Sequence, residues 1–109
     1  MNAVARLWDA LGAGDLARAA DELHPHAVVT RPHTGERFAS REAYLASYAE
    51  LLAGRRLEVR HVVTEGRTVA TEVVIEGEGR AWAVASFFRL HDGRILQAVE
   101  YWVGLPDRA

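Results

Sequence analysis

The fold of this chain is decided by the stretch AWAVASFFRLHDGRILQAVEYW, which runs from Ala81 to Trp102. Side chains alternate strictly along both halves of the stretch, and the turn His91-Asp92-Gly93-Arg94 separates them. Alternation with period two predicts two strands, and an Asp-Gly pair between them predicts a tight hairpin. One face of the first strand carries Trp82, Val84, Ser86, Phe88 and Leu90, and one face of the second carries Ala98, Glu100 and Trp102.

A carboxylate in the second strand, Glu100, lies between the apolar residues Ala98 and Trp102. A pocket in a half-buried sheet keeps its few polar atoms at such positions, because a buried polar group needs a partner. Both faces of the hairpin are rather apolar, which suggests a sheet covered on both sides. The stretch therefore predicts a sheltered cavity with Glu100 facing into it.

The overall composition limits the classes of protein to which this chain can belong. A length of 109 residues predicts one domain over residues 1–109, and 50% hydrophobic with 26% charged residues is ordinary for a globular protein. A net charge of -2 gives no electrostatic reason to expect nucleic acid or an acidic membrane as partner. The absence of cysteine excludes a thiolate metal site and a cysteine nucleophile. No apolar run is long enough for a membrane span, so we expect a soluble, cytoplasmic protein.

Three helices are predicted in the first half of the chain. The first carries an apolar stripe at helical spacing, and Gly12 and Gly14 should end it. Asp15 is a good N-cap for a second, short helix, which Pro25 should close. Ser40 caps a third helix, which should stop at Gly54. The stripe of the first helix is Val4, Leu7, Trp8 and Leu11.

Strand patterns fill the rest of the chain. Residues 27–31 form a strand stopped by Pro32, and a turn at 33–36 leads to a short return strand ending at Phe38. Residues 57–64 and 68–76 form a hairpin ahead of the two strands described above. This order predicts an α+β fold, with the helices on one face of a curved sheet that contains a four-strand antiparallel meander.

Five segments carry a resemblance to a known family, and together they cover nearly the whole chain. They are Ala10–Leu16, His24–Val29, Ser40–Tyr44, Phe88–Ile95 and Glu100–Trp102. With them the chain resembles the nuclear-transport-factor-2-like superfamily, and within it the small SnoaL-like proteins. The resemblance implies a cone-shaped α+β barrel, in which a strongly bent, mainly antiparallel sheet wraps around three N-terminal helices and leaves a deep apolar cavity.

The resemblance also implies a homodimer that pairs through the outer face of the sheet. A monomer that exposed so much apolar area would be unusual, which supports the same expectation on physical grounds. The outer face should include Glu72, Val74, Ala83, Ala85, Phe87, Val99 and Tyr101.

The resemblance excludes some activities better than it supports one, because this fold hosts many reactions. Ketosteroid isomerases pair a carboxylate base with a tyrosine and a protonated aspartic acid. Their positions correspond here to Arg31, Leu7 and Ser86, so all three roles are missing. Epoxide hydrolases of this fold need two carboxylates flanking an arginine, with a tyrosine and an asparagine, and the only asparagine is Asn2. SnoaL-like cyclases use a carboxylate base near the cavity mouth, for which Glu100 is best placed.

Three residues are the candidates for chemistry. Glu100, poorly solvated, would have a raised pKa and act as general acid or base. Alternatively it forms a structural ion pair with Arg31, which has the inward parity of its strand. Arg31 is also suited to a ligand carboxylate or enolate, and His33 lies near the expected cavity mouth.

The expected ligand is a small, mostly apolar molecule. No cofactor is expected, and no metal, because the five histidines lack ligand spacing and His24 and His26 should point oppositely. Three functions stay open: a cofactor-independent cyclase, isomerase or dehydratase; a ligand-binding module; or a structural dimer with a filled cone. The residues expected to line the cavity or core are Trp8, Tyr44, Tyr48, Val73, Trp82, Ser86, Phe88 and Trp102.

Overall fold

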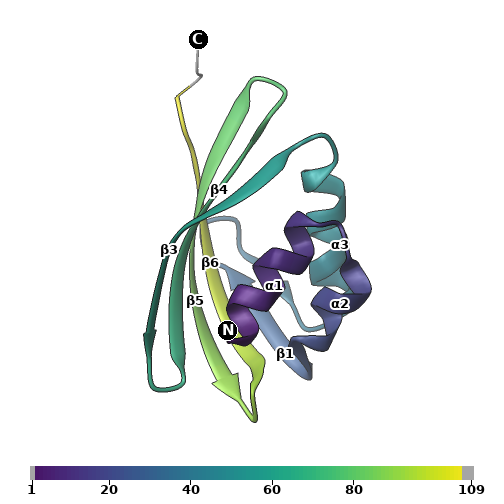
Figure 1. Cartoon of the computed structure of the whole chain (residues 1–109), viewed down its shortest axis with the longest axis vertical. Helices are drawn as coiled ribbons and strands as arrows, with labels where there is room; N and C mark the ends of the chain where they lie inside the picture. The colour runs from purple at the N-terminus through teal and green to yellow at the C-terminus, as the bar shows by residue number, and fades with distance from the viewer. Residues whose placement is uncertain (1, 107–109) are drawn as a thin grey trace.

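The computed structural model of the chain describes residues 2–106 (Figure 1). Met1 and residues 107–109, which the expected domain includes, lie outside the described residues. The helices and strands are α1 (Ala3–Gly12), α2 (Leu16–Asp21), β1 (Leu23–Arg31), β2 (Glu36–Phe38), α3 (Arg41–Leu52), β3 (Arg56–Glu65), β4 (Thr68–Gly77), β5 (Arg80–His91) and β6 (Arg94–Gly104).

Each helix begins at a side chain that caps its first turn. Asn2, Asp15 and Ser40 cap α1, α2 and α3, and each accepts a hydrogen bond from the backbone N–H three residues further on. Such a cap satisfies an N–H group that has no partner inside the helix. The caps predicted at Asp15 and Ser40 are confirmed.

The predicted end of the second helix was wrong. The helix ends at Asp21, and Pro25 lies inside β1, which begins at Leu23. A proline is tolerated there because the pairing of β1 with β6 changes register between Leu23 and Val28, so no regular ladder needs its missing N–H.

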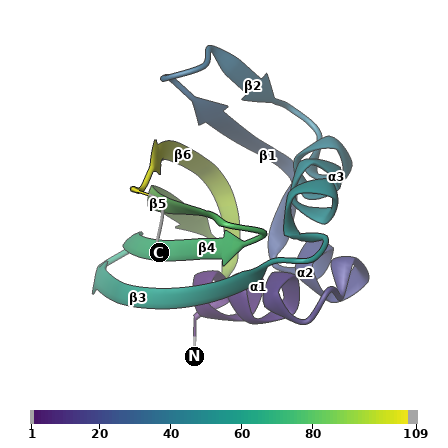
Figure 2. The ribbon, with the colours of Figure 1, turned by 90° about the horizontal axis from the view of Figure 1, so that it is seen from above.

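The sheet has six strands in the order β2-β1-β6-β5-β4-β3. Strands β3 to β6 form the predicted antiparallel meander, whereas β1 pairs with β6 in parallel. The helices lie together on one side of the sheet (Figure 1), and the sheet bends strongly between β3 and β2 (Figure 2). The architecture is therefore the expected α+β cone, with a curved sheet that does not close.

The predicted hairpin between β5 and β6 is confirmed. Asp92 and Gly93 form its tip with φ angles of 49° and 76°, the left-handed conformation that an Asp-Gly pair adopts readily. Register places Ser86 opposite Glu100 and Val84 opposite Trp102. The two strands therefore bring Glu100 and Trp102 to the same, inner face of the sheet.

The inner face is buried against the helices, and the outer face is open. Phe88 and Val84 on the inner face are 1% and 0% exposed, whereas Phe87 on the outer face is 52% exposed. The core between sheet and helices is dominated by the large side chains of Trp8, Tyr44 and Tyr48, which are closed off from water. The alternation read from the sequence therefore assigned the two faces of this hairpin correctly.

Between residues 2 and 106, none of the helices has the length and apolar character needed to cross a membrane.

Candidate functional site

Glu100 is the most deeply buried charged side chain among the described residues, with 0% exposure. It lies in a row that crosses three strands, opposite Ser86 on β5, which in turn lies opposite Thr71 on β4. A carboxylate at such a position needs compensation, because an isolated buried charge costs several kcal/mol or more.

Four donors supply that compensation. Arg31 Nε donates to Glu100 Oε1 at 3.1 Å, and the hydroxyl groups of Tyr44 and Tyr48 donate to Oε2 at 2.5 Å and 2.9 Å. The indole N–H of Trp102 lies 3.4 Å from Oε1. The expectation of a poorly solvated, reactive carboxylate considered burial alone, whereas the structure surrounds Glu100 with protein donors.

The tyrosines of this cluster are held in their neutral form. Burial raises the pKa of Tyr44 and Tyr48 well above 10, and the neighbouring Glu100 charge raises it further. Both hydroxyl groups therefore remain donors to the carboxylate. They come from successive turns of α3, where positions four apart share a face.

Arg31 connects the buried cluster with the surface. Burial lowers the pKa of Arg31, but the charge and hydrogen bond of Glu100 together with the neighbouring Tyr48 and Tyr44 outweigh this, so the pKa is raised overall. Nη2 donates to Ser47 Oγ at 3.2 Å, and Nη1 lies 3.6 Å from Glu36 Oε1, beyond hydrogen-bond distance. The guanidinium also lies over the Trp102 ring, 5.3 Å from its centroid. Arg31 is therefore held in place by the hydrogen bonds of Nε and Nη2. The N–H groups of Nη1 make no hydrogen bond within the described residues.

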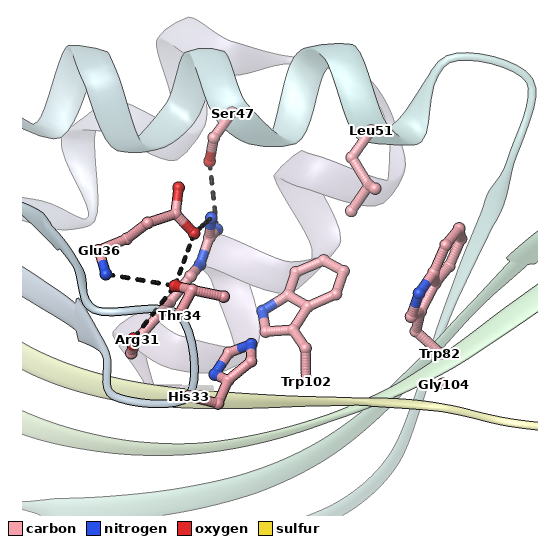
Figure 3. Close-up of a pocket in the computed structure, with 9 residues that line it drawn as sticks. All are labelled: Arg31, His33, Thr34, Glu36, Ser47, Leu51, Trp82, Trp102 and Gly104. Carbon is pink, nitrogen blue, oxygen red and sulfur yellow. Dashed lines mark hydrogen bonds and ion pairs between the residues drawn. The ribbon is translucent and has the colours of Figure 1, made fainter.

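A cavity of about 360 Å³ opens directly beside Arg31 (Figure 3). Ser47 and Leu51 point into it from α3, and the Trp102 ring stands opposite them on β6. This size is in the range of small-molecule sites. The residues that line it are Arg31, His33, Thr34, Glu36, Ser47, Leu51, Trp82, Trp102 and Gly104.

The structure separates the predicted site residues into two groups. Arg31, His33, Trp82 and Trp102 line the cavity, whereas Glu100 lies in the core beneath Arg31. The other residues expected around a ligand lie in the core, away from this cavity wall: Trp8, Tyr44, Tyr48, Val73, Ser86 and Phe88.

Sequence reasoning missed several cavity residues, of which Glu36 and Ser47 matter most. Glu36 pairs with Arg31 across the β1–β2 turn, so the register of the short return strand contained the signal. Ser47 and Leu51 continue the helical face of Tyr44 and Tyr48 by spacing of three or four residues. No pattern in the sequence marked Thr34 or Gly104 as a cavity residue, apart from their position next to predicted ones, His33 and Trp102.

Ser86 is a buried polar residue whose hydroxyl group is left unsatisfied within the described part of the chain. Ser86 Oγ is buried and has no hydrogen-bond partner among the described residues, although Ser86 lies opposite Glu100. The neighbouring Thr71 hydroxyl instead accepts from the Trp8 indole N–H at 3.1 Å.

Two surface histidines lie differently from their predicted arrangement. The rings of His24 and His26 are 5.5 Å apart rather than on opposite sides, and His91 lies 6.1 Å from His24. The prediction misapplied the strand period, because residues two apart lie on the same face of a strand; the His26 N–H also donates to His24 Nδ1 at 3.0 Å. Within residues 2–106, no three side chains of the metal-binding types are arranged to hold a metal ion.

Part of the epoxide-hydrolase pattern is present. Arg31 lies between two carboxylates, Glu100 at 3.1 Å and Glu36 at 3.6 Å. Asn2, however, caps α1 and donates to Thr64 at 3.3 Å. The asparagine that this set requires is thus engaged at the start of α1, and no asparagine lines the cavity.

The comparisons with known proteins agree with this architecture. The family model described as the SnoaL-like domain matches residues 4–98, ending just before Glu100. No protein with a curated description matches the chain.

Solved structures of the same fold cover most of the chain. A protein of Kribbella flavida DSM 17836, proposed to be a ketosteroid isomerase, has a TM-score of 0.87 at 20% identity, over 98% of this chain and 79% of that one. An NTF-2 like protein of unknown function from Burkholderia xenovorans LB400 has a TM-score of 0.84 at 26% identity, over 98% and 84%. Wild-type IdmH, a proposed polyketide cyclase from Streptomyces antibioticus, has a TM-score of 0.81 at 23% identity, over 92% and 88%.

The family match spans most of the chain, and the cone of helices and bent sheet is the fold of its structural neighbours. The chain therefore belongs to the SnoaL-like domain family and has the nuclear-transport-factor-2-like fold.

Proposed function

We propose that this SnoaL-like domain binds a small, mostly apolar organic molecule in the cavity beside Arg31. The observation that carries the proposal is an open cavity next to an Arg31–Glu100 ion pair that is already formed in the core. Because the pair satisfies Glu100 within the core, the cavity remains available to a ligand while the Arg31 guanidinium at its wall is held in place.

The apolar part of the ligand is expected between the two indoles. Trp82, Trp102 and Leu51 provide large apolar surfaces, and Gly104 leaves space next to them. Arg55 packs over the Trp82 ring, 5.0 Å from its centroid, which helps to hold that ring in place. Rigid aromatic walls of this kind favour a flat, unsaturated ligand.

The polar end of the ligand is expected at Arg31. Nη1 has donors that no hydrogen bond uses within the described part of the chain. The bonds to Glu100 and Ser47 hold the guanidinium in one orientation. A carbonyl or hydroxyl oxygen of the ligand would accept from Nη1, which adds direction to an otherwise apolar site.

Binding is tested with methyl naphthyl ketone, a flat aromatic ketone, by titration calorimetry. Leu51→Trp fills the cavity from α3 and should weaken binding at least tenfold, whereas Val103→Trp, on the exposed outer face, should leave it unchanged. Native mass spectrometry of protein purified from its host then identifies the natural ligand. Absence of ketone binding, or equal effects of both variants, would refute this site.

A second candidate function is proton transfer next to a carbonyl group, and the position of His33 favours it. Its imidazole lines the same cavity as Arg31. In this scheme neutral His33 removes a proton from the carbon next to the carbonyl, and Arg31 Nη1 stabilises the enolate oxygen that forms. The protonated His33 then returns the proton to another carbon or to a leaving group.

Glu100 has a different role in this scheme from the one expected from sequence. It is a positioning residue, which fixes Arg31 through Nε, because the carboxylate itself does not line the cavity. Isomerisation, cyclisation and dehydration all use such an enolate, and the names of the Kribbella and Streptomyces neighbours belong to this reaction class.

We also propose that the chain forms a homodimer through the outer face of its sheet. Strand register puts Phe87 in line with Val63 and Val99, and Tyr101 in line with Glu72 and Ala85. Phe87, Tyr101 and Val103 are 52%, 41% and 58% exposed. Pairing of two copies would remove this apolar face from water.

A further inference from the structure

Glu36 is the only carboxylate among the described residues that line the cavity. It lies on β2, a three-residue strand at the edge of the sheet, and its side chain is 49% exposed. The Thr34 hydroxyl donates to Glu36 Oε1 at 3.0 Å, which aims the carboxylate toward Arg31 Nη1 (Figure 3).

The charges around the cavity are already balanced before Glu36 is counted. The positive charge of Arg31 is matched by Glu100, at 3.1 Å and fully buried. Arg55, next to Trp82, is matched by Glu78 at 3.4 Å. Glu36 therefore adds a net negative charge at the polar end of the cavity, and His33 offsets it only when its imidazole is protonated.

An anionic ligand would meet this excess charge directly. A carboxylate that accepted from Arg31 Nη1 would lie beside Glu36, because Glu36 Oε1 is only 3.6 Å from the same nitrogen. Two like charges at such a distance repel strongly in a partly buried site. A neutral oxygen avoids the repulsion and still gains a hydrogen bond from Nη1.

We propose that Glu36 sets the charge selectivity of the cavity, so that it accepts neutral aromatic ketones, esters or phenols and rejects carboxylates. The inference rests on the proposed function, since it concerns the ligand of the same cavity. Glu36 does not block the neutral ligand, because its distance from Nη1 exceeds a hydrogen bond and leaves the donors of Nη1 unused.

The test compares two probes of nearly equal shape, methyl naphthyl ketone and naphthoate, on the intact chain by titration calorimetry. The unmodified protein should prefer the ketone. Glu36→Gln, which retains an oxygen that accepts from Thr34, should raise the affinity for naphthoate about tenfold and change that for the ketone less than threefold.

Glu65→Gln is the matched control, because it removes the same charge at the exposed β3–β4 hairpin and lies outside the cavity lining. It should leave both affinities unchanged. His33→Gln removes the imidazole that lines the same cavity, and the effect of Glu36→Gln on the naphthoate affinity should persist in that background.

Two results would overturn the inference while leaving the binding site intact: a preference of the unmodified protein for naphthoate, or an unchanged preference in Glu36→Gln. Failure of both probes to bind any variant would instead refute the proposed function, and the inference with it.

Discussion

The Arg31 guanidinium and the Glu100 carboxylate form a buried ion pair, 3.1 Å long, between positions 69 residues apart in the chain. The pair joins β1 to β6 on the inner face of the sheet, and the hydroxyl groups of Tyr44 and Tyr48 join α3 to the same carboxylate. One acidic side chain thus connects three elements of the cone. Its removal or exposure affects the fold before it affects any reaction.

Arg31→Met should destabilise the protein by about 3–5 kcal/mol, because it leaves the Glu100 charge buried without its cation. Urea unfolding followed by circular dichroism measures the change. Arg18→Ala is the control: it breaks an exposed pair with Asp9 at 2.7 Å, which should be worth less than about 1 kcal/mol. Equal effects of the two substitutions would show that the buried pair has no special role in stability.

Tyr44 and Tyr48 should stay neutral until the protein unfolds in alkali. Burial and the Glu100 charge raise the pKa of both tyrosines in the folded state, whereas an unfolded tyrosine ionises near 10. Their contribution to stability is therefore complete below about pH 10 and is lost as the pH rises above it. A titration of tyrosinate absorbance should show their ionisation only together with loss of the circular dichroism signal.

Tyr101→Phe separates the buried tyrosines from the exposed one. The chain has three tyrosines, and Tyr101 is 41% exposed on the outer face. No tyrosinate signal should appear in this variant while it remains folded, because Tyr44 and Tyr48 stay neutral. A signal from the folded Tyr101→Phe protein would mean that the hydroxyl groups around Glu100 are not closed off from solvent.

The sequence was sufficient for the faces of the sheet but not for the cavity wall. Alternation in β5 and β6 assigned Glu100, Trp102 and Ser86 to the interior because one face of a strand repeats every second residue. The same rule placed Arg31 on the inward side of β1, so its meeting with Glu100 was predictable as one of two alternatives.

The cavity wall depended on information that no local pattern contains. Glu100 accepts from Tyr44 and Tyr48 in the core, whereas Arg31 also donates to Ser47 at the cavity, so contacts between distant elements determine which of the two residues lines it. Glu36 was missed because it lies on a short edge strand with mostly exposed residues, where the hydrophobic pattern gives no signal. The parallel pairing of β1 with β6 likewise joins distant segments and cannot be read from either one.

Phe87→Lys should convert a dimer into a monomer if the outer face pairs as proposed. Phe87 is half exposed in the middle of that face, and a lysine there would be buried without a partner in the dimer. Sedimentation velocity measures the change. Ala49→Lys, on the exposed side of α3, should leave the oligomeric state unaltered. A monomeric unmodified protein at micromolar concentration would contradict the proposed dimer.

His33→Gln tests the proton-transfer scheme without knowledge of the natural substrate. A base next to the carbonyl of methyl naphthyl ketone should exchange its methyl protons for solvent deuterium, which proton NMR follows over time. Loss of a general base lowers such a rate by about 100-fold or more, while the affinity for the ketone should change little. His61→Gln is the control, since His61 pairs with Glu72 on the other side of the sheet.

Glu100→Gln decides between the two acid–base assignments. If Glu100 only positions Arg31, the variant should retain exchange and lose stability, because a neutral amide no longer matches the guanidinium charge. If it abolishes exchange while folded and able to bind the ketone, and His33→Gln does not, the buried carboxylate carries the proton. No exchange by the unmodified protein above the rate in buffer would leave ligand binding as the function of the cavity.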